Sequence, residues 1–131
     1  MNAKPTDTII ALFEDLSRIP RGSGNEAGLR IYLEQWAARQ GFGSAHDTVG
    51  NLVIRVPATA ACEAAPTIVL QGHLDMVCEK TPESNHDFAR DPIVVVRDGD
   101  WLRARGTTLG ADNGLGIAMA MAAATDPSLR R

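Results

Sequence analysis

The sequence predicts an α/β layered domain in which helices flank a mixed sheet, and three observations point to this class. Apolar residues recur at helical spacing near the start, a continuous apolar run spans residues 67–71, and Asp98-Gly99 separates two β-prone segments. The chain has 131 residues, of which 44% are hydrophobic and 22% charged. This composition is typical of one modest globular domain and excludes a disordered tail or a disulfide-dense toxin.

The first helix is predicted to begin at Thr6 or Asp7, because either side chain can cap it, and to end before Pro20. Its apolar face is expected to contain Ile9, Phe13 and Leu16. A loop over residues 20–24 separates it from the second helix.

The second helix is predicted to be capped by Asn25 and to run to Gln40, with Gly41 as the expected terminator. Its apolar face is expected to contain Leu29, Tyr32, Leu33, Trp36 and Ala37.

Two strands are predicted next. Residues 51–56 form the first, bounded by Gly50 and Pro57, and the Ala/Pro-rich residues 57–66 form a surface connection. Residues 67–71 form the second, because a short continuous apolar run is typical of a strand that is covered on both faces.

A hairpin and a helix complete the predicted elements. Residues 93–97 and 101–105 flank the turn signal Asp98-Gly99, and an apolar helix is expected from about Leu115 to Ala124. A helix that follows a strand usually leads to another strand of the same sheet. We therefore expect the sheet to be incomplete.

Charge and hydropathy exclude two classes of partner. The formal net charge is -3 and no basic stripe is present, which argues against nucleic acid. The longest all-apolar stretch, 117–124, is far shorter than the ~20 residues that cross a bilayer, and the start lacks signal-peptide architecture. We expect a soluble, cytoplasmic protein without a membrane partner. Cys62 and Cys78 are expected to be buried, reduced thiols.

The first candidate site is His73-Leu74-Asp75, at the end of the predicted strand 67–71. Side chains two apart in an extended segment point the same way, so His73 and Asp75 should share a face. A carboxylate beside an imidazole can hold its second nitrogen while the first binds a metal. The alternative is a polar strand end without a function.

The second candidate is Asp112, in the glycine-rich run Gly110–Gly116 that opens the last helix. Helix capping is the alternative role for an aspartate there. Three glycines in seven residues are more than one cap requires, and glycine lets a backbone approach a bound group closely. No phosphate-loop pattern aligns, which argues against nucleotide binding.

Other polar residues carry weaker signals. His46-Asp47 and His86-Asp87 lie in loop-like surroundings, where solvated histidines are expected. Ser23 lies in a glycine-rich loop that lacks the G-x-S-x-G elbow of serine hydrolases.

A set of motifs that occur in one order nonetheless resembles a known family. The motifs are I-P-R-G-S-G-N-E from Ile19, V-G-N-L from Val49, Q-G-H-L-D-M-V from Gln71, H-D-F from His86, D-P-I from Asp91 and A-R-G-T-T-L-G-A-D-N-G from Ala104. In these motifs and their order, the chain resembles the N-terminal part of the aminoacyl-histidine (Xaa-His) dipeptidases. That family belongs to the broader class of co-catalytic di-zinc exopeptidases.

The resemblance implies a site and a reaction. In that family the residue matching His73 is a zinc ligand, the one matching Asp75 supports the active site, and the one matching Asp112 bridges two zinc ions. Paired metals about 3.5–4 Å apart can share one carboxylate while they activate a water. The implied reaction is hydrolysis of a dipeptide substrate, with two zinc ions as cofactor and manganese or cobalt as possible substitutes.

The resemblance also implies that residues 1–131 are the N-terminal portion of one metallopeptidase catalytic domain. The family's Glu-Glu pair, its remaining metal ligands and its inserted second domain would lie beyond Arg131. Because each zinc needs about three protein ligands, this chain is expected to bind zinc weakly and to be inactive alone. Two alternatives are a related di-zinc deacylase of N-acyl amino acids and a non-catalytic α/β fragment that needs a partner chain.

Overall fold

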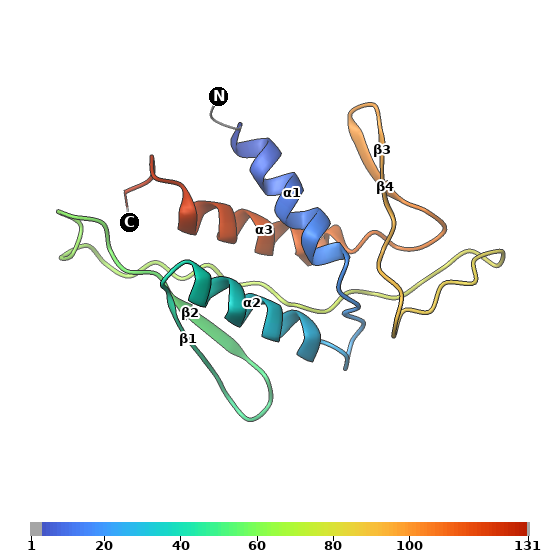
Figure 1. Cartoon of the computed structure of the whole chain (residues 1–131), viewed down its shortest axis with the longest axis horizontal. Helices are drawn as coiled ribbons and strands as arrows, with labels where there is room; N and C mark the ends of the chain where they lie inside the picture. Colours follow the sequence, from blue (N-terminus) through green and yellow to red (C-terminus); the bar gives the residue numbers. More distant parts are fainter. Residues whose placement is uncertain (1–3, 131) are drawn as a thin grey trace.

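The computed structural model describes residues 4–130 and contains helices and short antiparallel strands. The order along the chain is α1 (Pro5–Ser17), α2 (Ala27–Arg39), β1 (Gly43–His46), β2 (Leu52–Arg55), β3 (Val95–Asp98), β4 (Trp101–Ala104) and α3 (Ala111–Thr125). Figure 1 shows α1 crossing α3, α2 below α3, the β1–β2 hairpin below α2 and the β3–β4 hairpin at the upper right. The predicted α/β class is confirmed.

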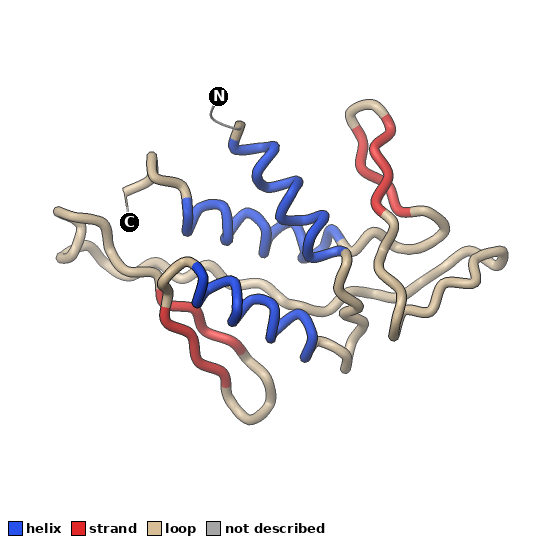
Figure 2. Tube along the Cα trace, in the orientation of Figure 1, coloured by secondary structure: helices blue, strands red, loops and turns tan. Residues whose placement is uncertain are grey.

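The strands form two separate hairpins, so the predicted mixed sheet is absent from the described part of the chain (Figure 2). β1 pairs with β2 and β3 pairs with β4, both antiparallel. The second hairpin and the strand within 51–56 were predicted. The pairing of Asp98 with Trp101 moves the two-residue turn to Gly99-Asp100, one position later than expected. β1 was not predicted, because Gly43-Ser44-Ala45 lacks the β-branched residues typical of strands.

The predicted strand over 67–71 is wrong for the described residues. This segment belongs to no ladder, and its apolar side chains are exposed: 83% for Ile68, 80% for Val69 and 64% for Leu70. An apolar run becomes a strand only where a neighbouring strand accepts and donates its backbone hydrogen bonds. No neighbouring strand is found within residues 4–130. The connection that contains it extends from the first hairpin to the second (Figure 1).

The helix starts differ from the predicted caps. Lys4 occupies the N-cap position of α1 and Pro5 its first turn, since proline there loses no intrahelical hydrogen bond. Glu26, rather than Asn25, is at the N-cap position of α2, and its carboxylate accepts a bond from the Gly24 N–H at 2.8 Å. The predicted end is confirmed: Gly41 has a φ of +75° and donates its N–H to the Ala38 carbonyl.

The hydrophobic core lies between the three helices. Its buried residues are Phe13, Leu16, Leu29, Leu33, Trp36, Ala37, Ala118 and Met121. The faces expected from helical periodicity therefore supply most of this core. Cys62 and Cys78 are free thiols, but both are half-buried rather than fully buried.

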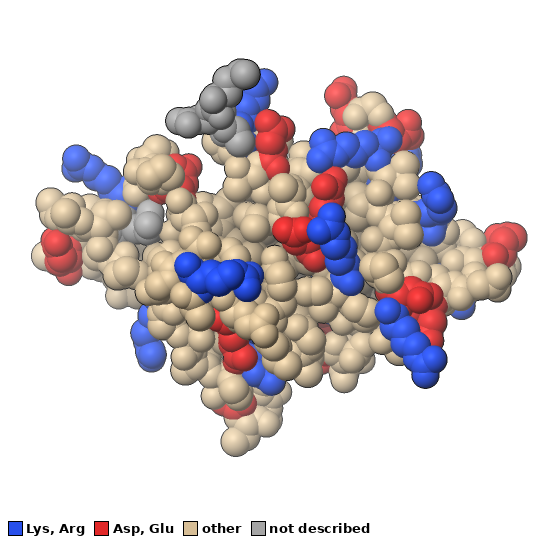
Figure 3. Space-filling model, in the orientation of Figure 1, with Lys and Arg blue, Asp and Glu red and all other residues tan. Residues whose placement is uncertain are grey.

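Charges of both signs are interspersed over the face seen in Figure 3. None of the helices described in residues 4–130 has the length and apolar character needed to cross a membrane.

Candidate functional site

His73, Asp75 and Asp112 lie together in the structure. The Nδ1 atom of His73 is 3.0 Å from Oδ1 of Asp75, and its Nε2 atom is 3.1 Å from Oδ1 of Asp112. His73 and Asp75 follow the extended segment 67–71, whereas Asp112 lies at the start of α3. The site is thus a meeting of two loop-like segments, not the strand edge expected from the sequence.

Both ring nitrogens of His73 face carboxylate oxygens. The hydrogen bond to Asp112 and, second, the one to Asp75 raise the pKa of His73 above its ordinary value of 6.5, because both stabilise the imidazolium. A metal cation that replaces the Nε2 proton would meet one imidazole nitrogen and one carboxylate oxygen. The His73 side chain is 50% exposed and that of Asp112 is 95% exposed, so solvent reaches the point between them.

Asp75 is oriented from two sides. Ser23 Oγ donates to its Oδ2 at 2.5 Å, which leaves Oδ1 for His73. The bond from Ser23 and, second, the bond from His73 lower the pKa of Asp75 below its ordinary value of 3.8. Asp75 therefore contacts the ring nitrogen opposite to the one that faces Asp112.

Asp112 lies at a kink near the start of α3. The N-cap position of α3 belongs to Gly110, no side-chain cap bond is made there, and Asp112 has non-helical backbone angles (φ -91°, ψ 107°). The Asp112–Asn113 peptide bond is cis. With its backbone outside the helical region, Asp112 directs its carboxylate toward His73.

Two glycines of the run 110–116 make room for a protein side chain. Gly110 has a φ of +71°, and a Cβ there would lie 2.7 Å from Nη2 of Arg21; a Cβ at Gly114 would lie 2.6 Å from the same atom. The sequence suggested that these glycines admit a bound group. At these two positions the space is occupied by Arg21.

The residues present fit part of a metal site. Two ligand atoms on a tetrahedral zinc with bonds of about 2.0–2.1 Å lie about 3.3 Å apart. His73 Nε2 and Asp112 Oδ1 are 3.1 Å apart, close to this spacing. Within residues 4–130 no group of three or more His, Cys, Asp or Glu side chains is arranged to hold a metal ion. His73 and Asp112 are therefore two candidate ligands, and Asp75 contacts the other ring nitrogen of His73.

The other histidines make contacts of their own. Nδ1 of the exposed His46 lies 2.7 Å from Oε1 of the half-buried Glu34. His86 is half-buried with its ring against Phe88, at a centroid distance of 4.5 Å, so the expectation of a solvated histidine is wrong there.

Arg21 and Ser23 contact the candidate site and were not identified from the sequence as parts of it. Arg21 is 2% exposed and donates to backbone carbonyls of both site segments, while Ser23 orients Asp75. Ser23 was weighed only as a nucleophile. The sequence of a polar loop does not indicate that one of its charged side chains is buried. The one available signal was that Arg21 and Ser23 lie beside the glycines of the I-P-R-G-S-G motif.

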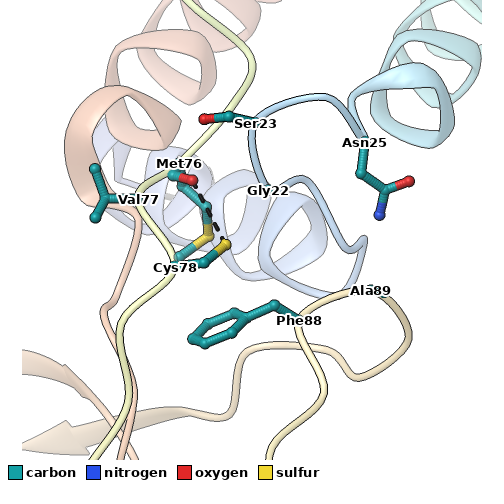
Figure 4. Close-up of a pocket in the computed structure, with 8 residues that line it drawn as sticks. All are labelled: Gly22, Ser23, Asn25, Met76, Val77, Cys78, Phe88 and Ala89. Atoms are coloured by element: carbon teal, nitrogen blue, oxygen red, sulfur yellow. Dashed lines mark hydrogen bonds between the residues drawn. The ribbon is translucent and has the colours of Figure 1, made fainter.

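An open hollow of about 500 Å³ lies beside this loop (Figure 4). Its lining combines the α1–α2 loop with the segment after Asp75: Gly22, Ser23, Asn25, Met76, Val77, Cys78, Phe88 and Ala89. Burial raises the pKa of the Cys78 thiol, which disfavours a nucleophilic thiolate there.

The chain is similar to hydrolases in sequence. It is 48% identical over 118 residues to the cytosol non-specific dipeptidase of Escherichia coli, which covers 90% of this chain and 24% of that protein. It is also 38% identical over 63 residues to a putative LysW-lysine/LysW-ornithine hydrolase of Aeropyrum pernix, covering 48% of this chain and 17% of that protein. No family model matches the sequence.

The structural match narrows the class to dipeptidases. The aminoacylhistidine dipeptidase of Vibrio alginolyticus matches with a TM-score of 0.91 and 38% identity, over 98% of this chain and 27% of that chain. The resemblance found in the sequence motifs is confirmed: the chain is similar, in sequence and structure, to part of such a dipeptidase. It spans about a quarter of the length of these two relatives.

Proposed function

We propose that this chain forms part of a metal-dependent dipeptidase, as the N-terminal portion of its catalytic domain. The observation that carries the proposal is the convergence of His73, Asp75 and Asp112 in a chain similar to two dipeptidases. The substrate class is a dipeptide, of the Xaa-His type or broader. The name of the Escherichia coli relative supports a cytoplasmic location.

In this proposal the cofactor is a pair of zinc ions, for which manganese or cobalt could substitute. Nε2 of His73 and the carboxylate of Asp112 would be the metal ligands that this chain supplies, and the two carboxylate oxygens of Asp112 would suit it to the bridging role. When bound, zinc polarises the scissile carbonyl and activates a water. The remaining ligands and the general base come from the part of such dipeptidases that this chain does not span.

The protein residues have distinct tasks. Asp75 holds Nδ1 of His73, which fixes the ring orientation and presents Nε2 toward Asp112. Ser23 holds the second oxygen of Asp75. A metal at Nε2 must displace a proton whose pKa is raised by Asp112 and Asp75, so binding should strengthen as pH rises.

Zinc titration of the 131-residue chain tests the site. Structural zinc sites with about four ligands contribute roughly 10–16 kcal/mol, so two ligands should contribute about half, a Kd of about 1 µM to 0.2 mM. His73→Ala should remove most of this binding, whereas His46→Ala, which alters an exposed histidine elsewhere, should not. Two tightly bound zinc ions, or equal binding by His73→Ala, would contradict the site.

Peptidase assays test the reaction. The 131-residue chain with added zinc should release amino acids from an Xaa-His dipeptide negligibly, because general-base assistance alone is worth about 10²–10⁴-fold. A chain completed with the remaining three quarters of such a dipeptidase should be active. In that longer chain Asp112→Ala should abolish activity; retained turnover would overturn the assignment.

A related amide hydrolase is the second candidate. The match to the putative LysW-lysine/LysW-ornithine hydrolase favours it, but that match has lower identity and covers 48% of the chain, against 90% for the dipeptidase. Hydrolysis of N-acyl amino acids by the completed chain, in the absence of dipeptide hydrolysis, would support this alternative.

A further inference from the structure

Arg21 is a buried charge in the loop between α1 and α2. It is 2% exposed, and none of the ion pairs found within residues 4–130 includes it, although the negative charge of Asp75 favours its charged form. Its Nε atom is buried without a hydrogen-bond partner. Burying a cation without an anion in direct contact opposes folding, so the hydrogen bonds of the guanidinium must offset this cost.

The guanidinium joins the two segments that carry the candidate metal ligands. Nη1 donates to the carbonyls of Leu74 and Asp75 at 3.1 and 3.4 Å, immediately after His73. Nη2 donates to the carbonyl of Gly110 at 2.6 Å, two residues before Asp112. One rigid group thus contacts the backbone on both sides of the site.

The surrounding backbone is built to accept this side chain. The Arg21 carbonyl accepts the Met76 N–H at 3.0 Å, and Gly22 and Met76 form a parallel bridge, so the loop is held beside the segment after Asp75. Figure 4 shows Gly22 and Met76 on these neighbouring segments. Gly110 and Gly114 supply the space for Nη2.

We propose that Arg21 is a positioning residue that sets the separation of His73 and Asp112. The inference rests on the metal site proposed above, because only there does this separation matter chemically. The planar guanidinium offers five donors in fixed directions, so it can bond two carbonyls of one segment and one of another at once. A lysine ammonium is a compact charge on a flexible stem and cannot hold the same three acceptors in that geometry.

Zinc affinity of the 131-residue chain is the test, measured by chemical-shift titration at a temperature where circular dichroism shows each variant folded. Arg21→Gln should weaken zinc binding at least tenfold, and Arg21→Lys should fall between it and the wild type. Arg18→Gln is the matched control, because Arg18 is exposed and pairs with Asp15 at the end of α1. It should bind zinc as the wild type does.

The outcomes separate this inference from the proposed function. If His73→Ala binds zinc as well as the wild type, the metal site itself is wrong. If His73→Ala weakens binding and Arg21→Gln, folded, does not, Arg21 is only structural and the inference fails. If Arg21→Gln does not fold, Arg21→Lys is the deciding variant. A folded Arg21→Lys chain that binds zinc with wild-type affinity would overturn the proposal.

Discussion

At the scale of single residues, the site combines groups that the sequence could reveal with groups that it could not. His73, Asp75 and Asp112 were found because their spacing and motif context carry chemical meaning. Arg21 is invisible by the same reasoning, since its role arises from acceptors on Leu74, Asp75 and Gly110, which only the fold brings near it. Backbone carbonyls have no signature in a sequence.

His73 should give the metal-free chain a pH-dependent stability. Its pKa is raised in the folded state by Asp112 and Asp75, so the charged imidazole stabilises the fold fully below about pH 6.5, the unfolded value. This contribution is lost as pH rises through the folded pKa. Urea unfolding with a chelator should show the wild type and His73→Asn converging at high pH and diverging below it. A constant difference across pH 5.5 to pH 8.5 would contradict this.

Gly110→Ala should be strongly destabilising. The residue has a φ of +71°, and its new Cβ would lie 2.7 Å from Nη2 of Arg21 and 2.8 Å from the Met76 sulfur. Backbone strain and overpacking together predict a loss of about 2–4 kcal/mol. Gly41→Ala is the matched control: it shares the positive φ but has open space around it, so it should lose only about 1 kcal/mol. Equal losses, measured by urea unfolding, would refute the steric contribution.

At the scale of elements, helical periodicity predicted the helices and their buried faces well, whereas the strand patterns predicted only some of the strands. Phe13, Leu16, Leu29, Leu33 and Trp36 all reach the core, because a helix satisfies its own backbone and needs only an apolar face. The run 67–71 had the correct composition for a buried strand, yet a strand requires a partner that no local pattern specifies. Its apolar side chains therefore remain exposed within the described structure.

Substitutions in this exposed segment should affect association rather than folding. Val69→Lys should change the free energy of unfolding by less than about 0.5 kcal/mol, because Val69 is 80% exposed. It should also reduce aggregation of the isolated chain, because an extended segment with exposed apolar side chains and unpaired backbone groups favours strand pairing between molecules. Light scattering and urea unfolding measure the two effects. Leu33→Lys is the control and should unfold the chain, because Leu33 is 3% exposed. If Val69→Lys lost as much stability as Leu33→Lys, segment 67–71 would have to be packed against the rest of the protein.

At the scale of the whole molecule, the surface is large for the mass. A compact monomer of 14.0 kDa should expose about 6,700 Å², whereas this chain exposes 8927 Å². This excess of exposed surface is consistent with the long irregular connection between β2 and β3. It is also consistent with a core whose buried residues come from the three helices. Hydrophobic burial per residue is correspondingly low.

Solution scattering should register this openness. A compact chain of this length has a radius of gyration of about 14 Å, so the isolated protein should exceed that value. Dilution to submicromolar concentration is the control for self-association, which would also enlarge the particle. A radius at or below about 14 Å for the monomer would mean that the connection folds back onto the helices.

The space filled by Arg21 also constrains how this sequence can change over generations. While the guanidinium remains, a Cβ at Gly110 or Gly114 would lie 2.7 or 2.6 Å from it, so a side chain at either position must displace Arg21. If Arg21 were exchanged first for a shorter residue, three carbonyl contacts would be lost and the guanidinium would no longer obstruct a Cβ at either glycine. The positive φ of Gly110 and the Met76 sulfur at 2.8 Å would still oppose a side chain there, and Phe13 at 2.9 Å would oppose one at Gly114. The cost of a side chain at either glycine therefore depends on which residue occupies position 21, and so on the order in which substitutions occur.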